Sequence, residues 1–391
     1  MATALMSLPG LAVRQVLAIG THRSDELPAS VEWLEASHPF PDERSERAAG
    51  RAVALARAVS PDEVLVLLLS GGASALMCAP VEGITLEQKV RTTKVMMEAG
   101  ADIHALNTVR RHLSRVKGGR LAAACRGATV TLAISDVVGD VISAIGSGPG
   151  VADPSTWPEA LVALSQWGGL NAHPPAVVDL VRRGAAGEAP DTPKPGDAAL
   201  ARAAGWVIGS RRDAIAGAAA AAAGRGYHPL VVDEPIVGEA RTVSRAWLTL
   251  ARRRAEGQPR PTCVVSAGET TVRVVGSGIG GRNLEFALAL AEPLHRASPP
   301  QAAASVGTDG IDGTSGVAGA IVDSTTIDRA SRHGIAAPGP YLDANDSFHY
   351  FLPLGDLIRL GRTDTNIGDL QVLLIGIDPL PNGDEETHRV G

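Results

Sequence analysis

Two carboxylates and four glycines share the segment 307–316, which follows the short apolar run 302–306. Glycine has no side chain beyond Cα, so backbone amides and the carboxylates of Asp309 and Asp312 can approach a ligand closely. This composition suits a metal–phosphate or polyol site, with both aspartates as candidate metal ligands. Asp-Gly pairs are also common turn signals, so a surface turn is the alternative for this loop taken alone.

A second loop, 70–76, follows the apolar run 64–69. Its small residues Ser70, Gly71, Gly72 and Ser74 can direct amides and hydroxyls at the oxygens of a phosphate or a carboxylate. The loop matches neither a Walker A motif nor a dinucleotide fingerprint. Short glycine motifs often mark only structural turns, so that alternative stays open here as well.

Asp136 follows the apolar run 129–134, a position where parallel-sheet proteins hold metals or orient hydroxyls. An Asx turn or a helix cap is the commoner use of such an aspartate. Between the loop 70–76 and the loop that contains Asp136, the segment 107–120 predicts a helix. Its basic residues include Arg111, Arg115 and Lys117. Such a face is usually solvated, but Lys117 is the only lysine of the chain beside a glycine pair.

In the C-terminal third, Glu269 follows a predicted strand, and the glycines of 278–281 precede a helix that begins near Arg282 and Asn283. Free amides, the helix dipole and a guanidinium together predict an anion site. Asn283 capping the helix is the simpler alternative. The polar segment 361–370 is predicted to start another helix.

The sequence shows no nucleophile–base pair. His38, His112 and His349 are isolated along the chain, and each is interpreted as structural. The remaining candidates for chemistry are backbone amides, hydroxyls, carboxylates and arginines. These groups suit phosphoryl transfer, in which positioning and charge stabilisation outweigh covalent participation.

Composition places limits on the class of protein. The chain has 391 residues, 45% of them hydrophobic, and a net charge of -6. This predicts a soluble two-domain enzyme. Without a basic run, nucleic acid and anionic membranes are not expected as partners. The three cysteines lack metal-ligand spacing, which predicts free thiols and a cytoplasmic location. A homodimer is the only protein partner expected.

Apolar runs alternate with helix-length patterns, which predicts an α/β fold with parallel sheets flanked by helices. The predicted strands are 64–69, 129–134, 206–208, 230–232, 263–265, 303–306 and 372–375. The predicted helices are 86–99, 107–116, 211–223, 238–254 and 284–294. A break at 256–261 separates an N-terminal domain, 1–257, from a C-terminal domain, 262–378.

These motifs, in this order, resemble the class II glycerate kinase family, whose C-terminal domain is called MOFRL. The matching segments are 37–43, 70–76, 107–121, 135–140, 147–149, 268–271, 280–285, 308–313 and 365–366. The resemblance implies a Rossmann-like N-terminal domain and a MOFRL domain, each a mostly parallel sheet, with the site in the cleft between them. It also implies ATP-dependent phosphorylation of D-glycerate to 2-phosphoglycerate with Mg²⁺.

Residue types and loop positions then suggest individual roles. Arg282 is expected to stabilise the transferring phosphoryl group, and Asp309 or Asp312 to hold Mg²⁺ or orient the substrate hydroxyl. Lys117 is a further catalytic candidate. The predicted substrate- and phosphate-binding residues are Ser70, Gly71, Gly72, Ser74, Asp136, Glu269, Asn283, Thr308 and Asn366.

Two other functions are weighed against the kinase. An NAD(P)H-dependent hydroxypyruvate reductase, a name that many members of this family carry, requires a dinucleotide fingerprint and a His or Lys acid, and neither is visible. The other alternative is an inactive ligand-binding paralogue. Family members usually begin with a strand and a glycine–lysine motif, whereas residues 1–5 resemble the helix after it. The sequence therefore predicts that one βα unit and its lysine are missing from this form.

Overall fold

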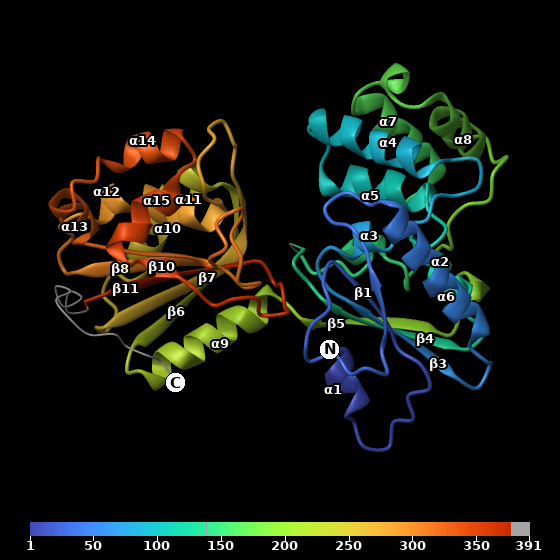
Figure 1. Ribbon diagram of the computed structural model, residues 1–391, viewed down its shortest axis with the longest axis horizontal. Helices are drawn as coiled ribbons and strands as arrows, with labels where there is room; N and C mark the ends of the chain where they lie inside the picture. Colours follow the sequence, from blue (N-terminus) through green and yellow to red (C-terminus); the bar gives the residue numbers. More distant parts are fainter. Residues whose placement is uncertain (138, 377–391) are drawn as a thin grey trace. The chain divides into compact units, whose positions relative to one another are not determined.

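The computed structural model describes residues 1–137 and 139–376. The chain divides into two compact units, Met1–Ile208 and Gly209–Gly391 (Figure 1). Residues 209–257, assigned above to the N-terminal domain, contribute two helices and a strand to the second unit. The domain limits 1–257 and 262–378 stay a prediction, and residues 377 and 378 lie outside the described residues.

The first unit contains a two-stranded sheet, β1-β2, and a three-stranded sheet with the order β3-β4-β5. The pairs β1–β2 and β3–β4 are parallel. The strands of this unit are β1 (Leu17–Gly20), β2 (Glu32–Glu35), β3 (Val64–Leu69), β4 (Ala128–Ile134) and β5 (Ala203–Gly209). Its helices are α1 (Ala2–Met6), α2 (Glu43–Ala58), α3 (Ala73–Leu76), α4 (Leu86–Glu98), α5 (Ile103–His112), α6 (Arg120–Ala123), α7 (Trp157–Gln166) and α8 (Pro175–Ala185), with a short 3-10 turn η1 (Ile145–Ser147).

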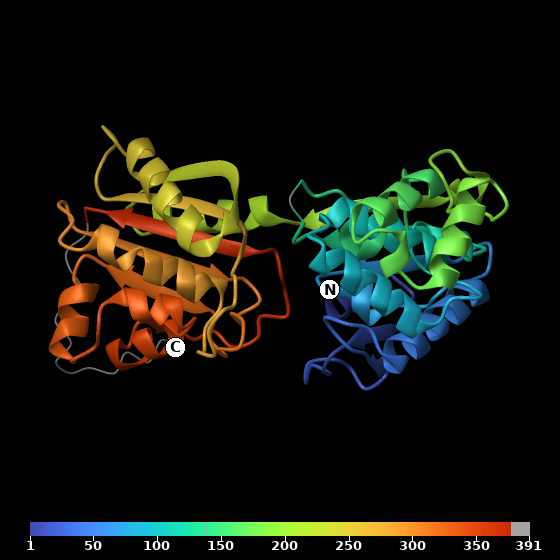
Figure 2. The same ribbon diagram turned by 90° about the horizontal axis from the view of Figure 1, so that it is seen from above.

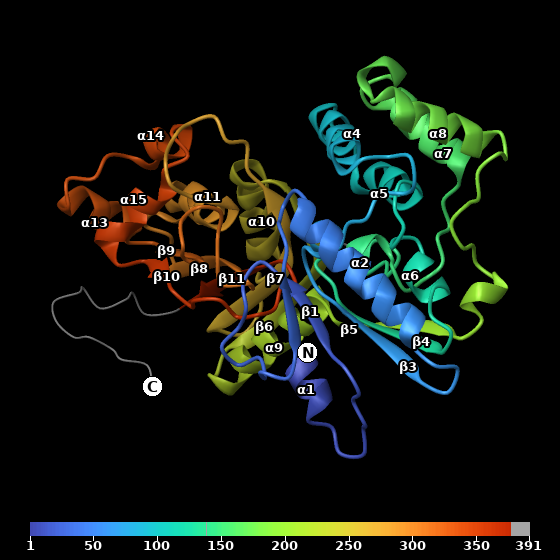
Figure 3. The same cartoon turned by 45° about the vertical axis from the view of Figure 1, so that its right-hand side comes forward.

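Three apolar cores hold these elements together, and the smallest joins Leu69, Ala133 and Ile145. Helix α2 contributes the small side chains of Ala49, Ala52 and Ala56 to one core, which also contains Leu65 of β3. Helices α4, α5, α7 and α8 form a separate core around Trp157 (Figure 3). Since α5 belongs to this helical core, it provides a rigid base for the loops that face it.

The helix predicted over 107–116 is shifted in the structure. Helix α5 runs from Ile103 to His112, so Arg115 and Lys117 do not lie on it. The chain leaves the helix at Leu113 and runs beside residues 79–81. Gly118 and Gly119 then adopt positive φ values, 57° and 78°, which glycine tolerates most easily. Lys117 therefore belongs to a turn and not to a basic helix face.

The second unit is built on a six-stranded sheet with the order β10-β9-β8-β11-β7-β6. Its strands are β6 (His228–Glu239), β7 (Thr262–Thr271), β8 (Gln301–Gly307), β9 (Gly319–Asp323), β10 (Leu357–Ile358) and β11 (Asp369–Ile375). Its helices are α9 (Arg211–Gly224), α10 (Ala240–Arg254), α11 (Arg282–Ala289), α12 (Ala291–Leu294), α13 (Thr326–Arg332), α14 (Pro338–Asp343) and α15 (Ser347–Phe351).

Helices cover both faces of this sheet. Val264 of β7 packs in the core with α10 and α11, whereas its neighbours Cys263 and Val265 pack against α9 on the opposite face. Figure 2 shows α10 and α11 beside each other across the strands. Because both faces are buried, the strands read as nearly continuous apolar runs, which is why the sequence located them.

The α/β class is confirmed, but strand pairing in the second sheet differs from the expectation of a mostly parallel sheet. Only β6 and β7 pair in parallel, and the other ladders are antiparallel. The connection 308–318 between β8 and β9 contains no crossover helix and so returns the chain in the opposite direction, which explains the β8–β9 ladder. The segment 361–370 also starts no helix, because it leads into strand β11.

The three cysteines are free, as predicted, with Cys78 and Cys263 buried and Cys125 partly buried. Within the described residues, no helix is long and apolar enough to cross a membrane.

Candidate functional site

In the first unit, the loop 70–76 follows β3 and leads into α3. Gly72 has a φ of 79°, and Gly71 and Gly72 each leave a backbone N–H without an acceptor in residues 1–137 and 139–376. The hydroxyl of Ser70 is equally uncommitted in that part of the chain. The predicted binding residues Ser70, Gly71 and Gly72 therefore offer three hydrogen-bonding groups on one short loop.

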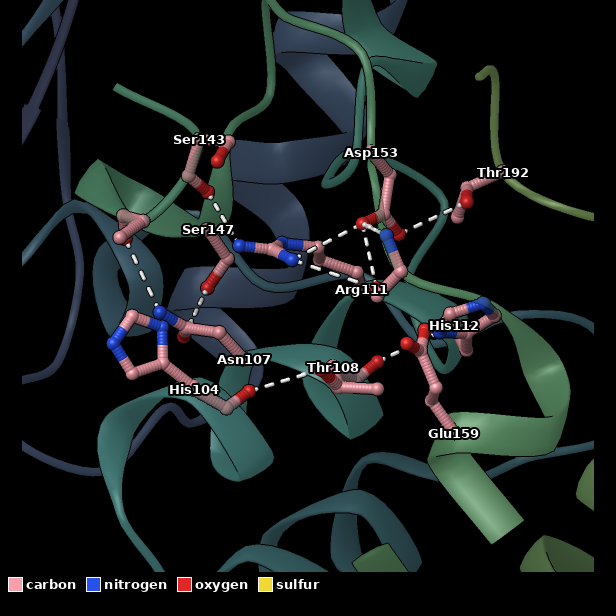
Figure 4. Close-up of polar contacts among 12 residues, drawn as sticks. His104, Asn107, Thr108, Arg111, His112, Ser143, Ser147, Asp153, Glu159 and Thr192 are labelled. Carbon is pink, nitrogen blue, oxygen red and sulfur yellow. Dashed lines mark hydrogen bonds and ion pairs between the residues drawn. The ribbon is translucent and has the colours of Figure 1, made fainter. Parts of the chain in front are cut away.

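Ser74 is anchored by a chain of buried hydrogen bonds. Its hydroxyl lies 3.0 Å from the Ser147 hydroxyl, which donates to Asn107 Oδ1 at 3.0 Å. From the same helix, Arg111 donates to the carbonyl oxygen of Ser143 at 2.8 Å and pairs with the buried Asp153 (Figure 4). Helix α5 thus fixes the loop 143–148, and that loop fixes Ser74.

His38 lies beside the same loop, although sequence reasoning interpreted it as structural. A Cβ placed on Gly72 would lie 3.1 Å from His38 Cδ2 and 3.4 Å from Nε2, so the imidazole covers this glycine. Burial lowers the pKa of His38, and the predicted site residue Asp136, which follows β4, opposes that shift. The position of His38 just after the end of β2 could have identified it as a candidate site residue, but the sequence did not reveal this strand.

Lys117 is buried beneath this loop, with 1% of its surface exposed. Its Nζ donates to the carbonyl oxygens of Ser74 at 2.7 Å and Met77 at 3.3 Å. Burial lowers the pKa of Lys117 to about 7, with Cys78 opposing the shift and Lys89 adding to it. Since its amino group binds backbone carbonyls, Lys117 holds the loop in place, and its catalytic role stays a prediction.

In the second unit, Arg282 is the first residue of α11 and is held by two carboxylates. Its Nε lies 3.0 Å from Asp369, and its Nη1 lies 3.0 Å from Glu269. Burial lowers the pKa of Arg282, but Asp369 and Glu269 outweigh it, so the net shift is upward. Asp369 is fully buried, and burial raises its pKa against the opposing effect of Arg282. Sequence reasoning missed Asp369 because it placed this residue in a helix-starting loop.

Asp312 binds the first turn of α11. One carboxylate oxygen accepts from the Asn283 N–H at 3.0 Å, and the other accepts from the Leu284 N–H at 2.8 Å. A Cβ on Gly281 would lie 2.3 Å from Asp312 Cγ, so glycine is required there for the carboxylate to approach. Burial raises the pKa of Asp312 to about 6. Asp312 therefore caps α11, and its predicted metal role stays a prediction.

Asn283 connects the acidic groups around Arg282. Its Nδ2 donates to Asp369 at 2.9 Å and to Asp312 at 3.3 Å, and its Oδ1 accepts from Ser305 at 2.7 Å. Because Asn283 is almost fully buried, this predicted site residue orients the carboxylates and the helix that carries Arg282.

Asp309 lies near this cluster. A Cβ placed on Gly307 would lie 3.1 Å from Asp309 Oδ1 and 3.5 Å from Asn283 Nδ2, so both side chains border the same glycine. Asp309 is half-buried and accepts from the Ile311 N–H at 3.1 Å. Thr308 donates to the Gly368 carbonyl at 2.7 Å, and Asn366 accepts from the Gly368 N–H at 3.0 Å. The structure thus brings together the predicted residues of the second unit.

The described residues contain no group of three or more His, Cys, Asp or Glu side chains that could hold a metal ion. Mg²⁺ does not require one, since it is usually bound by one or two carboxylates together with substrate phosphates and water. The half-buried Asp309 fits that mode of binding, whereas both oxygens of Asp312 already accept backbone amides.

The two ends of the chain match different family models. Residues 1–182 match the DUF4147 domain of unknown function, and residues 262–369 match the MOFRL family.

Relatives with recorded names cover most of the chain. A protein of Agrobacterium vitis with the provisional name hydroxypyruvate reductase is 40% identical over 91% of this chain and 80% of its own length. A glycerate 2-kinase of Pyrococcus horikoshii is 34% identical over 88% of this chain and 78% of its own length. The crystal structure of a Thermotoga maritima glycerate kinase matches with a TM-score of 0.81 and 33% identity, covering 93% of this chain and 85% of that one.

Proposed function

Because this chain belongs to the glycerate kinase family with a C-terminal MOFRL domain, we propose that it phosphorylates D-glycerate with ATP and releases 2-phosphoglycerate. The observation that carries this proposal is the arrangement of Arg282 at the start of α11, fixed by Asp369 and Glu269. A guanidinium held by two carboxylates keeps its charge and its direction, which are the properties that stabilise a transferring phosphoryl group.

Among residues 1–137 and 139–376, Nη2 of Arg282 has no hydrogen-bond acceptor and can bind a phosphate. The hydrogen bonds to Asp369 and Glu269 use Nε and Nη1, and Nη2 takes part in neither. The side chain is 29% exposed, so a ligand can reach it. We assign Nη2 to a phosphate oxygen, with Thr308 and Asn366 on neighbouring loops as further polar contacts.

Asp309 is the residue that would hold Mg²⁺ in the second unit. It is half-buried, and within the described residues its Oδ1 accepts one hydrogen bond and its Oδ2 accepts none, so Oδ2 can bind a ligand. When bound, Mg²⁺ supplies positive charge that neutralises phosphate oxygens. Asp312 supports this site indirectly, because it caps the helix that begins at Arg282.

The loop of the first unit suits the hydroxy acid. Ser70, Gly71 and Gly72 supply hydrogen bonds for a carboxylate, and Asp136 supplies an acceptor for a hydroxyl. The partly buried hydrogen bond between the Ser74 and Ser147 hydroxyls keeps this loop in one conformation. Lys117 supports the loop from below through two backbone carbonyls.

The test is an assay that couples ADP formation to a spectroscopic signal, with D-glycerate, ATP and Mg²⁺, and with L-glycerate as the control substrate. Phosphorus NMR of the product separates 2-phosphoglycerate from 3-phosphoglycerate. Glycerate-dependent ADP formation without NADH supports the proposal. Its absence, in a protein that still binds glycerate and ATP by calorimetry, would support the inactive binding paralogue.

The hydroxypyruvate reductase names of the Agrobacterium vitis relatives make a reductase the second candidate. Oxidation of NADH or NADPH by hydroxypyruvate, without ATP, would establish it. We also propose a cytoplasmic location, supported by the free cysteines, because free thiols persist in reducing compartments. The expected homodimer stays a prediction that light scattering can test.

A further inference from the structure

The segment that carries His38 is held rigidly between β2 and α2. The buried Ser45 hydroxyl accepts from the N–H of Ser37 at 3.2 Å and from the N–H of Asp42 at 3.4 Å. On the outer side, Lys94 of α4 lies 4.8 Å above the ring of Phe40. The residues before and after His38 are therefore anchored, and its side chain is presented in a defined position.

The His38 ring itself forms no hydrogen bond within the part of the chain that the structure describes. It remains exposed and covers Gly72, with Nε2 on the side of that glycine. The adjoining amides of Gly71 and Gly72 are also uncommitted there. The imidazole and the two amides lie beside one another and have no hydrogen-bond partner among the described residues. A bound molecule can satisfy this hydrogen-bonding capacity.

The charges near this loop select the kind of molecule. Asp136 is close enough to influence His38 electrostatically, and its carboxylate can accept a hydrogen bond from a hydroxyl group. Lys117 contacts the loop, but it donates to the carbonyls of Ser74 and Met77. A triphosphate is usually held by cations, whereas a small acid with hydroxyl groups needs donors for its carboxylate and an acceptor for its hydroxyls.

We propose that the imidazole of His38 binds the hydroxy-acid substrate, together with the amides of Gly71 and Gly72. This inference rests on the proposed kinase function and adds to it a substrate-contacting residue. In this arrangement His38 hydrogen-bonds an oxygen of glycerate, and Asp136 accepts from a glycerate hydroxyl. The adenine nucleotide makes no contact with His38.

Kinetics of His38→Ala and His38→Gln test the proposal. Loss of a hydrogen bond to a charged ligand predicts that His38→Ala raises KM for D-glycerate about 10- to 100-fold, with KM for ATP nearly unchanged. In His38→Gln, an amide reaches the former Nε2 position and should restore part of the loss. His104→Ala removes an exposed histidine of α5 and serves as the control. An unchanged KM for glycerate, or an equal rise in both KM values, would overturn the proposal.

A binding measurement separates this inference from the kinase function. In NMR spectra of the histidine ring protons, the His38 signal is identified by its absence from the His38→Gln spectrum. It should shift on addition of D-glycerate and stay fixed on addition of a non-hydrolysable ATP analogue with Mg²⁺. That result supports the contact even if no phosphoryl transfer is found. A signal that ignores saturating glycerate, or that responds only to the nucleotide analogue, refutes the contact even if the kinase is active.

Discussion

Each unit places a basic side chain beside a candidate ligand loop, but the surroundings of Arg282 favour its charged form and those of Lys117 disfavour it. Arg282 of the second unit is held by Asp369 and Glu269, and these carboxylates favour its charged form. Within the described residues, Lys117 of the first unit donates to two backbone carbonyls, and burial lowers its pKa to about 7. The first arrangement keeps a positive charge for a ligand, and the second uses a cation to hold a loop.

This difference suggests that the two units bind different ligands. A phosphoryl group in transfer spreads negative charge over its oxygens and requires a fixed positive charge. A small hydroxy acid requires directed hydrogen bonds, which Ser70, Gly71 and Gly72 offer. We therefore assign the phosphate to the second unit and the hydroxy acid to the first, and the following predictions test that assignment.

The largest effect is expected for Arg282→Ala, which should reduce kcat about 10³-fold or more, since arginines at phosphoryl transition states contribute that much. Arg282→Lys should recover little, because an ammonium cannot reproduce the geometry of the guanidinium. Thermal melting of both variants is needed, since removing Arg282 leaves the buried Asp369 without its ion pair. Turnover of Arg282→Ala close to that of the wild type would refute its role.

The paired variants Asp312→Ala and Asp309→Ala separate a structural carboxylate from a metal-binding one. Asp312→Ala leaves the amides of Asn283 and Leu284 without acceptors, at a cost of about 2–5 kcal/mol in the free energy of unfolding. Asp309→Ala should lower the free energy of unfolding by about 1 kcal/mol or less. It should also raise the Mg²⁺ concentration needed for the half-maximal rate. Denaturant titration and Mg²⁺ titration measure the two effects. Equal destabilisation by both variants would contradict this separation.

The third prediction concerns Lys117 and pH. An unfolded lysine titrates near pH 10.4, so above pH 7 the unfolded chain holds a proton that the folded protein has released. Unfolding free energy should therefore rise with pH, by up to about 4 kcal/mol between pH 7 and 10. Lys117→Met should remove the part of this rise that Lys117 contributes, while Lys89, whose pKa burial lowers to about 8, keeps its own part. Lys94→Met, at an exposed lysine, should keep the whole rise. Denaturant titrations across this pH range that show the same slope in Lys117→Met and the wild type would contradict the prediction.

The sequence predicted those parts of the molecule that depend on local pattern. Strands buried on both faces produce apolar runs, so each predicted strand overlaps an observed one. The loops at the ends of these strands could then be located, and these loops contain Ser70, Asp136 and Asp309. Strands β1 and β2 were not predicted, because they are short and β2 contains the charged residues Glu32 and Glu35.

The remaining features depend on contacts between distant residues. Asp312 caps a helix that begins 30 positions earlier, and no local pattern indicates this. Asp369 reaches Arg282 only because β11 inserts between β7 and β8, a strand order that the sequence did not reveal. His38 was interpreted as isolated because its position over Gly72 depends on where β2 places the following segment.

The smallest effect is expected at Asn107, which supports the loop 70–76 indirectly, through Ser147. Asn107 is buried, accepts from the Ser147 hydroxyl and donates to the Ala144 carbonyl at 3.3 Å. Asn107→Ala should lower the free energy of unfolding by about 1–3 kcal/mol, since buried polar groups lose their partners. It should also raise KM for D-glycerate a few-fold and leave KM for ATP unchanged, because Ser147 would no longer fix Ser74.

Thr108→Ala provides the matched control for Asn107→Ala. Thr108 lies on the same helix, and its hydroxyl donates to the carbonyl of His104 within α5, so its loss does not reach the loop 70–76. Its KM values should both match those of the wild type. If Asn107→Ala instead raised KM for ATP while KM for glycerate stayed constant, the loop 70–76 would bind the nucleotide. The assignment of ligands to the two units would then have to be reversed. Loss of the support for Ser74 weakens binding of whichever ligand the loop 70–76 contacts.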